Sequence, residues 1–409
     1  MKYSIFRRIG RVALKVVVGL LVILAIALAW LINFRGYAIS DASMLWRMMH
    51  DGGITAPSPK VISQQLIVPS GFKLTLFAKD LPSARLMVPT INGDLVLIQP
   101  RGGLVILLQG DRDGDGISDG RRVLFSGLDR PNGIDLHEGW LYIGEATRVS
   151  RTRFDSRTGT VRGALQPLVI GLTADGNHWR KTTRIGPDGA MYLGQGSTCN
   201  VCVERDSRRA TIMRIAADGS SSEIFATGLR NPYGFDWAPW NGALYATENG
   251  RDLLGDDLPP DELNLIKRGG FYGWPYIHGT NLPDPEFSAG HEAEIARALP
   301  PAFEFSAHNA PLGIRFLRHP ARGLDFERSA LVALHGSWNR SEPDGYSVVS
   351  LHWGLNGVII QRPFLTGFRS AAGLIGRPVD VSEGIAGEIY VSDDYAGAIY
   401  KITRLPASN

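Results

Sequence analysis

The chain has 409 residues, which is enough for one large domain or two of ordinary size. Its 43 Lys and Arg residues nearly balance 40 Asp and Glu residues, so the formal net charge is only +3. This balance gives no reason to expect nucleic acid as a partner, and the 48 Gly and 24 Pro residues favour turns between short strands over a helical fold.

The first clear element is an uncharged stretch, residues 16–32, that follows a cluster of basic residues (Lys2, Arg7, Arg8, Arg11 and Lys15). A helix of that length rises about 25 Å and nearly spans the hydrocarbon core of a bilayer. Basic residues before the stretch predict a cytoplasmic N-terminus. We therefore interpret residues 1–33 as one transmembrane helix in the inner membrane, with the rest of the chain in the periplasm. Small residues at Ala25, Ala27 and Ala29 leave a cleaved signal peptide as the alternative.

Residues 34–60 are interpreted as a linker, because Gly and Pro residues interrupt the chain before a globular body that covers residues 61–405. The body repeats one unit, a turn followed by a short apolar strand. Six copies begin near Asn92, Glu138, Asp188, Asn241, Arg328 and Ala386. This repeat predicts an all-β fold, a six-bladed β-propeller in one domain, whose loops meet at a central channel. A pair of β-sandwiches would not show one unit six times. Residues 406–409 form a short tail.

An acidic segment in the first part of the body, residues 111–119, has the spacing of an EF-hand-like calcium loop. Alternate Asp side chains can converge on one hard cation, and Gly116 permits the sharp turn. Arg122 stands at the twelfth position, where an EF-hand has a Glu, so we expect a structural loop between strands. The predicted ligands are Asp111, Asp113, Asp115 and Asp119, and a solvated acidic turn is the alternative.

The chain contains only two cysteines, Cys199 and Cys202. In an oxidising compartment such a close pair is most simply a disulfide, and a redox-active pair is the alternative. Val203 follows the second cysteine, so the motif for covalent haem attachment is absent. Two cysteines without a second pair also argue against a structural zinc site.

A group of polar motifs lies in the middle of the chain. It contains Asn177-His178-Trp179-Arg180, Arg230-Asn231-Pro232, Glu248-Asn249-Gly250, Asp261-Glu262-Leu263-Asn264 and Gly269-Gly270-Phe271-Tyr272-Gly273-Trp274-Pro275. An Arg beside an Asn offers fixed donors to a carboxylate-rich ligand, and a His among polar loops can act as a general base. In their order and spacing these motifs resemble the PQQ-dependent sugar dehydrogenases (PQQ, pyrroloquinoline quinone). This family of six-bladed propellers includes the soluble quinoprotein glucose dehydrogenases and, most similar here, the L-sorbosone dehydrogenases. The resemblance covers roughly residues 70–405.

The resemblance implies a role for each matching residue. His178 would remove the proton of the sugar hydroxyl, and Arg230 would stabilise negative charge on the quinone oxygen. The backbone carbonyls of Gly250 and Arg251 would bind the calcium ion that holds the cofactor. Contacts to the cofactor would come from Asn231, His308, Arg340 and Arg377. For the fifth-blade lysine of the family there is no clear match, and His335 is the alternative to Arg340. Where the glucose dehydrogenases carry an Asp beside the substrate, this chain has Ser197.

The resemblance thus implies a PQQ-dependent oxidoreductase that oxidises a sugar or sugar aldehyde, of the sorbosone or aldose class, by hydride transfer to a calcium-bound quinone. Electrons would pass to a respiratory quinone in the membrane or to another acceptor. Two other functions stay open: a calcium-dependent lactonase-like hydrolase, and a non-catalytic propeller that binds glycan or protein. A lactonase needs carboxylate and amide side chains aimed at one metal from separate blades, whereas the ligands inferred here are backbone carbonyls.

Overall fold

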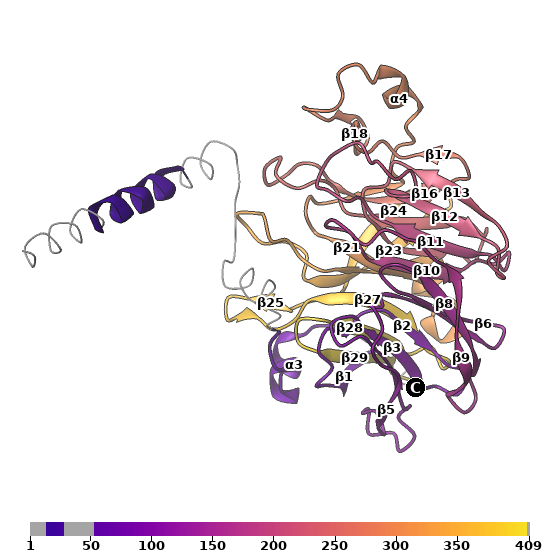
Figure 1. Cartoon of the computed structure of the whole chain (residues 1–409). Coiled ribbons are helices and arrows are strands. Elements are labelled where there is room, and N and C mark those ends of the chain that lie inside the picture. The colour runs from indigo at the N-terminus through magenta and orange to yellow at the C-terminus, as the bar shows by residue number, and fades with distance from the viewer. Residues whose placement is uncertain (1–13, 28–52, 407–409) are drawn as a thin grey trace, which may run out of the picture.

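A computed structural model describes residues 14–27 and 53–406 of the chain. Its body is a ring of β-sheets, one for each repeat of the sequence (Figure 1). The first blade contains β2 (Met87–Pro89), β3 (Leu95–Gln99), β4 (Leu104–Leu108) and β5 (Arg121–Phe125). The second contains β6 (Gly133–His137), β7 (Trp140–Gly144), β8 (Val149–Asp155) and β9 (Thr160–Val169).

The third and fourth blades follow the same antiparallel order. The third contains β10 (Lys181–Ile185), β11 (Met191–Gln195), β12 (Thr211–Ile215) and β13 (Ser222–Thr227), with β17 (Gly270–Phe271) added in parallel at its edge. The fourth contains β14 (Pro232–Trp237), β15 (Leu244–Glu248), β16 (Asp261–Ile266) and β20 (Phe303–Phe305).

The last two blades close the ring. The fifth contains β21 (Pro311–Phe316), β22 (Ser329–Leu334), β23 (Ser347–Trp353) and β24 (Ile359–Leu365). The sixth contains β27 (Pro378–Glu383), β28 (Ile389–Asp393), β29 (Ala398–Arg404) and, as its outermost strand, β1 (Phe72–Ala78) from the start of the body. Because β1 pairs antiparallel with β29, with Phe72 opposite Arg404, the two ends of the body are joined in one sheet and the ring has no open seam.

The innermost strands β2, β6, β10, β14, β21 and β27 each contact their two neighbours and form a closed circle. The six turn-and-strand repeats of the sequence are the second strands β3, β7, β11, β15, β22 and β28, each with the turn that precedes it. The prediction of a six-bladed propeller is therefore confirmed.

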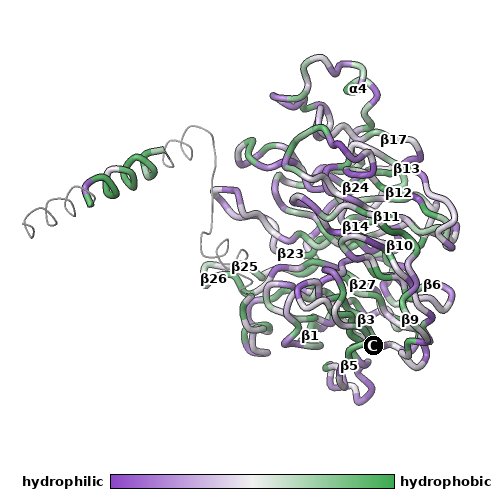
Figure 2. The backbone as a smooth tube through the Cα atoms, viewed as in Figure 1, coloured by the Kyte–Doolittle hydropathy of each residue, from purple (hydrophilic) through white to green (hydrophobic). Residues whose placement is uncertain are grey.

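The core lies between the blades, because each blade packs against a neighbour on both faces. Strand β3 shows this most simply: Leu95, Val96, Leu97 and Ile98 are all fully buried. Val96 and Ile98 pack with residues of the second blade, whereas Leu95 and Leu97 pack with residues of the sixth. Side chains of a strand alternate between its faces, so a strand covered on both faces has a continuous apolar sequence. Figure 2 shows these apolar strands inside the ring and polar residues around it.

Short elements lie outside the blades. Helix α3 (Pro59–Gln65) is capped by Ser58, whose Oγ accepts a hydrogen bond from Val61 N, and it falls at the end of the predicted linker. The remaining short elements are β18 (Ile277–His278), β19 (Leu282–Pro283), α4 (Glu292–Arg297), η1 (Pro320–Arg322), η2 (Leu324–Phe326), β25 (Arg369–Ser370) and β26 (Gly373–Leu374).

Residues 14–27 are helical and exposed. Within 14–27 and 53–406, none of the helices combines the length and the apolar character needed to cross a membrane. The transmembrane helix predicted for residues 1–33 is thus not confirmed, and the remainder of that range lies outside the described residues, as do 34–52 of the predicted linker and 407–409 of the tail.

Candidate functional site

A cavity of about 570 Å³ opens at the end of the ring where the innermost strands begin. We call it the central well. Its wall contains residues from all parts of the body, among them Arg85, His178, Arg180, Asn231, His335 and Arg377. Four of these stand within two residues of the start of an innermost strand: Arg85 before β2, Arg180 before β10, Asn231 before β14 and Arg377 before β27. The circular fold therefore brings together residues that are far apart in the sequence.

The wall of the well is strongly cationic. It contains five arginines (Arg85, Arg101, Arg130, Arg180 and Arg377) but only one acidic residue, Asp394, among the described residues. Arg85 donates hydrogen bonds to Asp394 and, at 2.9 and 2.8 Å, to the hydroxyl of Tyr233. His335 Nε2 lies 2.9 Å from Asp394, and burial lowers the pKa of His335 to about 4, so this imidazole is neutral and donates to the carboxylate. The wall therefore keeps an excess of positive charge, which suits a ligand with several carboxylates.

Arg180 contributes most clearly to this excess. Burial, followed by the positive charge of Arg85, lowers the pKa of Arg180 to about 10. In the described part of the chain its guanidinium stacks on the ring of Trp179, 4.8 Å from the ring centre, and forms no hydrogen bond or ion pair. A half-buried cation that lacks an anion in the protein is destabilising. An anion in the well would remove that cost.

His178 is held in one orientation. Its Nδ1 atom lies 3.1 Å from the carbonyl oxygen of Ser197 and 2.9 Å from Ser197 Oγ. Because Ser197 Oγ donates its own proton to the carbonyl of Cys199 at 2.7 Å, both Ser197 atoms are acceptors for His178. The proton of the neutral ring therefore sits on Nδ1, and Nε2 carries a lone pair. Burial, and then the charge of Arg230, lowers the pKa of His178 well below 6.5, so the ring is neutral at pH 7.

His178, Asn231 and the backbone of Arg230 meet at Gly196. A methyl group at Gly196 would lie 2.5 Å from His178 Cβ, 2.8 Å from Asn231 Oδ1 and 3.2 Å from the carbonyl oxygen of Arg230. No side chain fits at this position. Because Gly196 has no side chain, the predicted base His178 can lie beside the predicted cofactor ligand Asn231. Asn231 is fixed in turn, because its Nδ2 donates to Asn249 Oδ1 at 2.9 Å.

The side chain of Arg230 does not line the well, contrary to its predicted contact with the quinone. Its side chain is only 4% exposed, and all five of its N–H groups have protein acceptors. These acceptors are Asn200 O and Oδ1 and Asp252 Oδ2, each at 2.8 Å, Asn249 O at 3.1 Å and Gly250 O at 2.6 Å. Arg230 thus acts on His178 through its charge and has no N–H group left for a ligand.

The predicted catalytic calcium does not fit this arrangement. The carbonyl oxygen of Gly250, one of its two predicted ligands, already accepts a hydrogen bond from the Arg230 guanidinium. A cation bound there would face a second fixed positive charge at close range. The guanidinium of Arg251 adds another fixed positive charge to this segment, and it is buried and paired with Asp284 at 2.6 Å. We therefore derive no catalytic step from a metal at Gly250 and Arg251.

Two predicted cofactor ligands lie outside the well. His308 Nε2 lies 2.8 Å from the carbonyl oxygen of Gly255. Arg340 donates to the carbonyls of Asp256 and Ala307. Both side chains therefore fix the loop around residue 256. His335, the alternative to Arg340, does line the well.

The acidic loop brings Asp111, Asp113 and Asp115 together, with carboxylate oxygens within 4.8 Å of one another, and Asp119 is not part of that group. The side chain of Asp111 is 5% exposed. Its Oδ2 accepts from Lys401 Nζ at 2.8 Å, while its buried Oδ1 has no partner in the described residues. Asp119 instead accepts from the backbone N of Arg112 at 3.2 Å.

Cys199 and Cys202 form a disulfide, which confirms that prediction. The bond closes a four-residue loop whose first residue accepts the hydrogen bond from Ser197. The loop therefore lies next to the predicted base.

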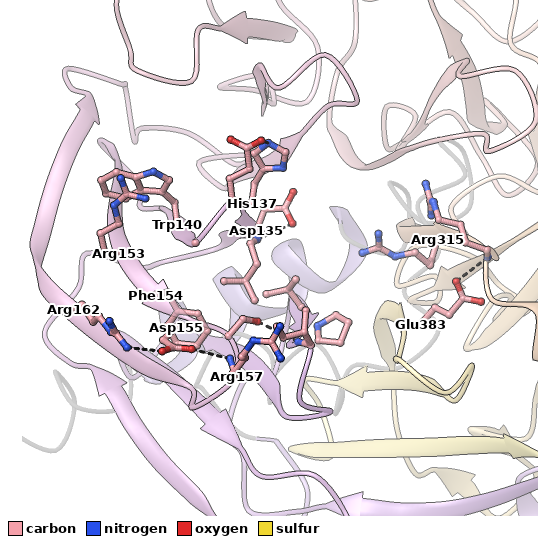
Figure 3. A pocket seen from close by; sticks show the side chains of 18 residues that line it. Asp135, His137, Trp140, Arg153, Phe154, Asp155, Arg157, Arg162, Arg315 and Glu383 are labelled. Atoms are coloured by element: carbon pink, nitrogen blue, oxygen red, sulfur yellow. Dashed lines mark hydrogen bonds and ion pairs between the residues drawn. The ribbon is translucent and has the colours of Figure 1, made fainter.

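A larger cavity of about 920 Å³ lies at the opposite end of the innermost strands (Figure 3). Asp135 and His137 enter it from β6, Arg315 from β21 and Glu383 from β27. Its acidic groups have partners: Asp155 accepts from Arg162 at 2.5 Å, and Glu383 accepts from the backbone of Arg318 at 2.7 Å. None of the predicted site residues lines this cavity. The greater volume therefore does not identify it as the reactive site.

The sequence-based prediction missed Arg85, Arg180 and Asp394 as residues of the well. Arg180 stands in the motif around His178 but was assigned no role, and Arg85 and Asp394 belong to no recognisable motif. A positional signal could have found two of them, since Arg85 and Arg180 stand at the start of an innermost strand, as the predicted ligands Asn231 and Arg377 do. In a propeller these equivalent positions all face the same channel.

Comparisons with known proteins find similar sequences and similar folds. The sequence model of the family described as Glucose / Sorbosone dehydrogenase matches residues 144–337, and that of a family described as TrAA12-like matches residues 284–405. A pyrroloquinoline quinone-dependent pyranose dehydrogenase of Coprinopsis cinerea is 25% identical over 423 residues. The alignment covers 86% of this chain and 56% of that protein, so the chain spans about half the length of this relative.

Solved structures share the fold. The calcium structure of a Trichoderma reesei carbohydrate-active enzyme of family AA12 has a TM-score of 0.74 at 21% identity, over 86% of this chain and 98% of that one. The holo form of the PQQ domain of the Coprinopsis cinerea pyranose dehydrogenase has a TM-score of 0.71 at 21% identity, over 86% of this chain and all of that one. The family match over residues 144–337, the relatives and the six-bladed fold together support a relation of this chain to the soluble quinoprotein glucose dehydrogenase-like family.

Proposed function

We propose that this protein oxidises a sugar or sugar aldehyde with PQQ bound in the central well. The observation that carries the proposal is the pairing, in one cavity, of a neutral histidine with a free ring nitrogen and an excess of arginines. The arginines suit a polyanionic cofactor, and the neutral histidine can remove a hydroxyl proton. Relatives named as PQQ-dependent sugar and pyranose dehydrogenases support the choice of cofactor and substrate class.

The residues present fit PQQ, which is a planar quinone with three carboxylates. Arg85, Arg180 and Arg377 face the well from three different blades, and a volume of about 570 Å³ lies in the range of ordinary small-molecule sites. When bound, the quinone supplies the hydride acceptor. The protein supplies arginines that hold anionic groups, Asn231 as a hydrogen-bonding side chain at the wall, and His178 as the base.

His178 would act through its Nε2 atom. The bonds from Nδ1 to Ser197 fix both the tautomer and the plane of the ring. A substrate hydroxyl that donates to Nε2 would lose its proton to that nitrogen. The hydride would leave from the carbon that carries this hydroxyl. The ring must be neutral to accept that proton, and its lowered pKa keeps it neutral at pH 7.

The experiment that tests this proposal uses the full chain in detergent, supplied with PQQ. Reduction of an artificial electron-acceptor dye is measured with aldoses, sorbosone and simple alcohols, with and without added calcium. We expect sugar-dependent dye reduction that requires PQQ and is lost in His178→Gln. Lactone cleavage without PQQ would instead identify a hydrolase, and the absence of both activities would identify a binding propeller.

Two further proposals concern the surroundings of the site. We propose that the acidic loop binds a structural calcium ion through Asp111, Asp113 and Asp115, supported by the buried, unpartnered Oδ1 of Asp111. We also propose that residues 1–33 hold the propeller at the periplasmic face of the inner membrane, where a respiratory quinone takes the electrons. The disulfide supports an oxidising compartment. Membrane fractionation, with protease treatment of intact spheroplasts, tests the location.

A further inference from the structure

The disulfide-closed loop, residues 199–202, contacts Arg230 directly and is linked to His178 through Ser197. On one side, His178 Nδ1 donates to Ser197, and Ser197 Oγ donates to the carbonyl of Cys199 at 2.7 Å. On the other side, Asn200 accepts two hydrogen bonds from Arg230, one at its backbone oxygen and one at Oδ1, both at 2.8 Å. A single short loop therefore connects the proposed base with the buried arginine beside it.

Every polar side-chain atom of Asn200 is used. Besides the bond from Arg230, its Oδ1 accepts from the backbone N of Asp252 at 2.8 Å, and its Nδ2 donates to the carbonyl of Asp252 at 3.0 Å. Asp252 in turn pairs with Arg230 at 2.8 Å. The three residues form a closed network in which Asn200 is the only member that comes from the disulfide loop.

The backbone N–H groups of the loop add nothing to these contacts. The loop lies outside helices and strands, and within the described structure none of the backbone N–H groups of residues 199–203 donates a hydrogen bond. The segment before it is tied down, because Thr198 donates to Glu204 at 2.6 Å and Arg209 donates to the carbonyl of Ser197 at 3.0 Å. Between those points the backbone is fixed by the covalent bond from Cys199 to Cys202 and by the hydrogen bonds that the carbonyls of Cys199 and Asn200 accept.

From these contacts we propose that the disulfide loop is the positioning element of the site: it orients His178 through Ser197 and Cys199, it holds Arg230 through Asn200, and opening the disulfide lowers turnover while the propeller stays folded. Asn200 is the positioning residue. This inference rests on the proposed role of His178 as the base. Loss of the constraint gives the loop several conformations, and a base misplaced by about 1 Å costs on the order of 100-fold in rate.

The charges around His178 provide a second readout. The charged groups near its ring are Arg180, Arg209 and Arg230, all cationic, and they disfavour protonation of the ring together with burial. Of these, Arg230 is the one that the disulfide loop holds directly. If the loop opens, Arg230 gains freedom to move away with Asp252, and His178 becomes easier to protonate.

The test uses the full chain with Cys199 and Cys202 both changed to Ser. Reductants are avoided, because thiols also reduce quinones. We expect this variant to keep its unfolding temperature within a few degrees and to bind PQQ, while kcat falls roughly 10- to 100-fold. We further expect that modification of His178 by diethyl pyrocarbonate, followed by peptide mass spectrometry across pH, shows a midpoint displaced upward toward about 6.5.

Variants within the loop separate positioning from folding. Asn200→Ala removes the Oδ1 acceptor and should lower kcat. Val201→Ala is a slightly smaller truncation at the next position that removes no hydrogen bond, and it should leave kcat unchanged. Asn200→Asp keeps an oxygen acceptor for Arg230 and should retain more turnover than Asn200→Ala. If the double Cys variant fails to fold, the order of kcat among these three variants decides whether the disulfide loop positions the site.

A folded double variant with wild-type kcat and an unchanged midpoint for His178 would overturn the proposal. Failure of the proposed function looks different. In that case the wild-type protein itself shows no PQQ-dependent dye reduction, while the modification of His178 still reveals whether the disulfide loop controls the ring.

Discussion

The imidazole of His178 and the hydroxyl of Ser197 form a hydrogen bond of 2.9 Å whose direction is fixed by a third group, the carbonyl of Cys199. Because the serine hydroxyl donates to that carbonyl, it can only accept from His178. The ring is thereby limited to the tautomer with a free Nε2. A serine is sufficient for this task, whereas the glucose dehydrogenases of the resemblance carry an Asp beside the substrate.

The first prediction concerns the pH dependence of turnover. The pKa of His178 is lowered well below 6.5, so the free base persists at acidic pH. We therefore expect the acid limb of kcat/KM to fall below pH 6.5, with activity flat from there to neutrality. His178→Gln should lower kcat by about 100-fold or more, since general-base catalysis contributes typically that much. A limb at or above pH 6.5 in the wild type would contradict the assignment.

The second prediction concerns Arg180, the cation that lacks an anionic partner in the described structure. Arg180→Met removes the repulsion from Arg85 and the burial of a charge, so the unfolding temperature of the PQQ-free protein should rise. The same change removes a charged donor from the well and should weaken PQQ binding by roughly 10- to 100-fold, the effect of about 1.5–3 kcal/mol. Calorimetry and fluorescence titration measure the two effects.

The matched control for Arg180 is Arg340→Met. The sequence assigns Arg340 to the cofactor, but its guanidinium bonds to the carbonyls of Asp256 and Ala307 outside the well. We therefore expect unchanged PQQ affinity in this variant. Weaker binding in Arg340→Met than in Arg180→Met would favour the assignment from the sequence over the geometry.

The fold could be predicted from the sequence because the turn-and-strand pattern repeats along the chain. Each of the six turn-and-strand copies corresponds to one second strand, and a strand buried on both faces, such as Leu95–Gln99, has an apolar residue at nearly every position. The closing strand Phe72–Ala78 was not identified as part of the last blade, because its partner, Ala398–Arg404, lies at the other end of the chain.

The residues of the site could be predicted from the sequence only in part. The motifs around His178 and Asn231 identified two residues that do line the well. They could not show that Arg230 turns away from it, because the direction of that side chain depends on five acceptors from four residues. Nor could they find Arg85 or Asp394, which pair across the closure of the ring and belong to no local pattern.

The third prediction concerns the acidic loop. Calcium that binds Asp111, Asp113 and Asp115 should raise the unfolding temperature, and at 100 times Kd it would stabilise the folded state by about 2.7 kcal/mol. Asp113→Asn should remove the calcium effect. Lys401→Met should strengthen it, because Lys401 competes for Asp111 Oδ2 at 2.8 Å. Thermal unfolding with calcium or a chelator measures both, and an equal effect of magnesium would argue against a site selective for calcium.

The fourth prediction concerns Lys181, which is fully buried and donates to the carbonyls of Thr173 and Trp179, the latter next to His178. Burial, followed by the charge of Arg209, lowers the pKa of Lys181 to about 7. The unfolded chain therefore binds more protons than the folded protein between pH 7 and the ordinary pKa of lysine near 10.5. It follows that this group makes the protein more stable as pH rises through that window, by up to about 1.4 kcal/mol per pH unit.

Other buried groups titrate as well, so the contribution of Lys181 is measured as a difference. In Lys181→Met the side chain carries no charge at any pH, and the free energy of unfolding should increase less between pH 7 and 10 than in the wild type. The variant also leaves the carbonyls of Thr173 and Trp179 without this donor, which lowers stability by a similar amount at every pH. Denaturant unfolding at pH 7, 8, 9 and 10 separates the two effects, because only the first changes with pH. Parallel curves for the two proteins would mean that Lys181 is charged throughout this range in the folded protein.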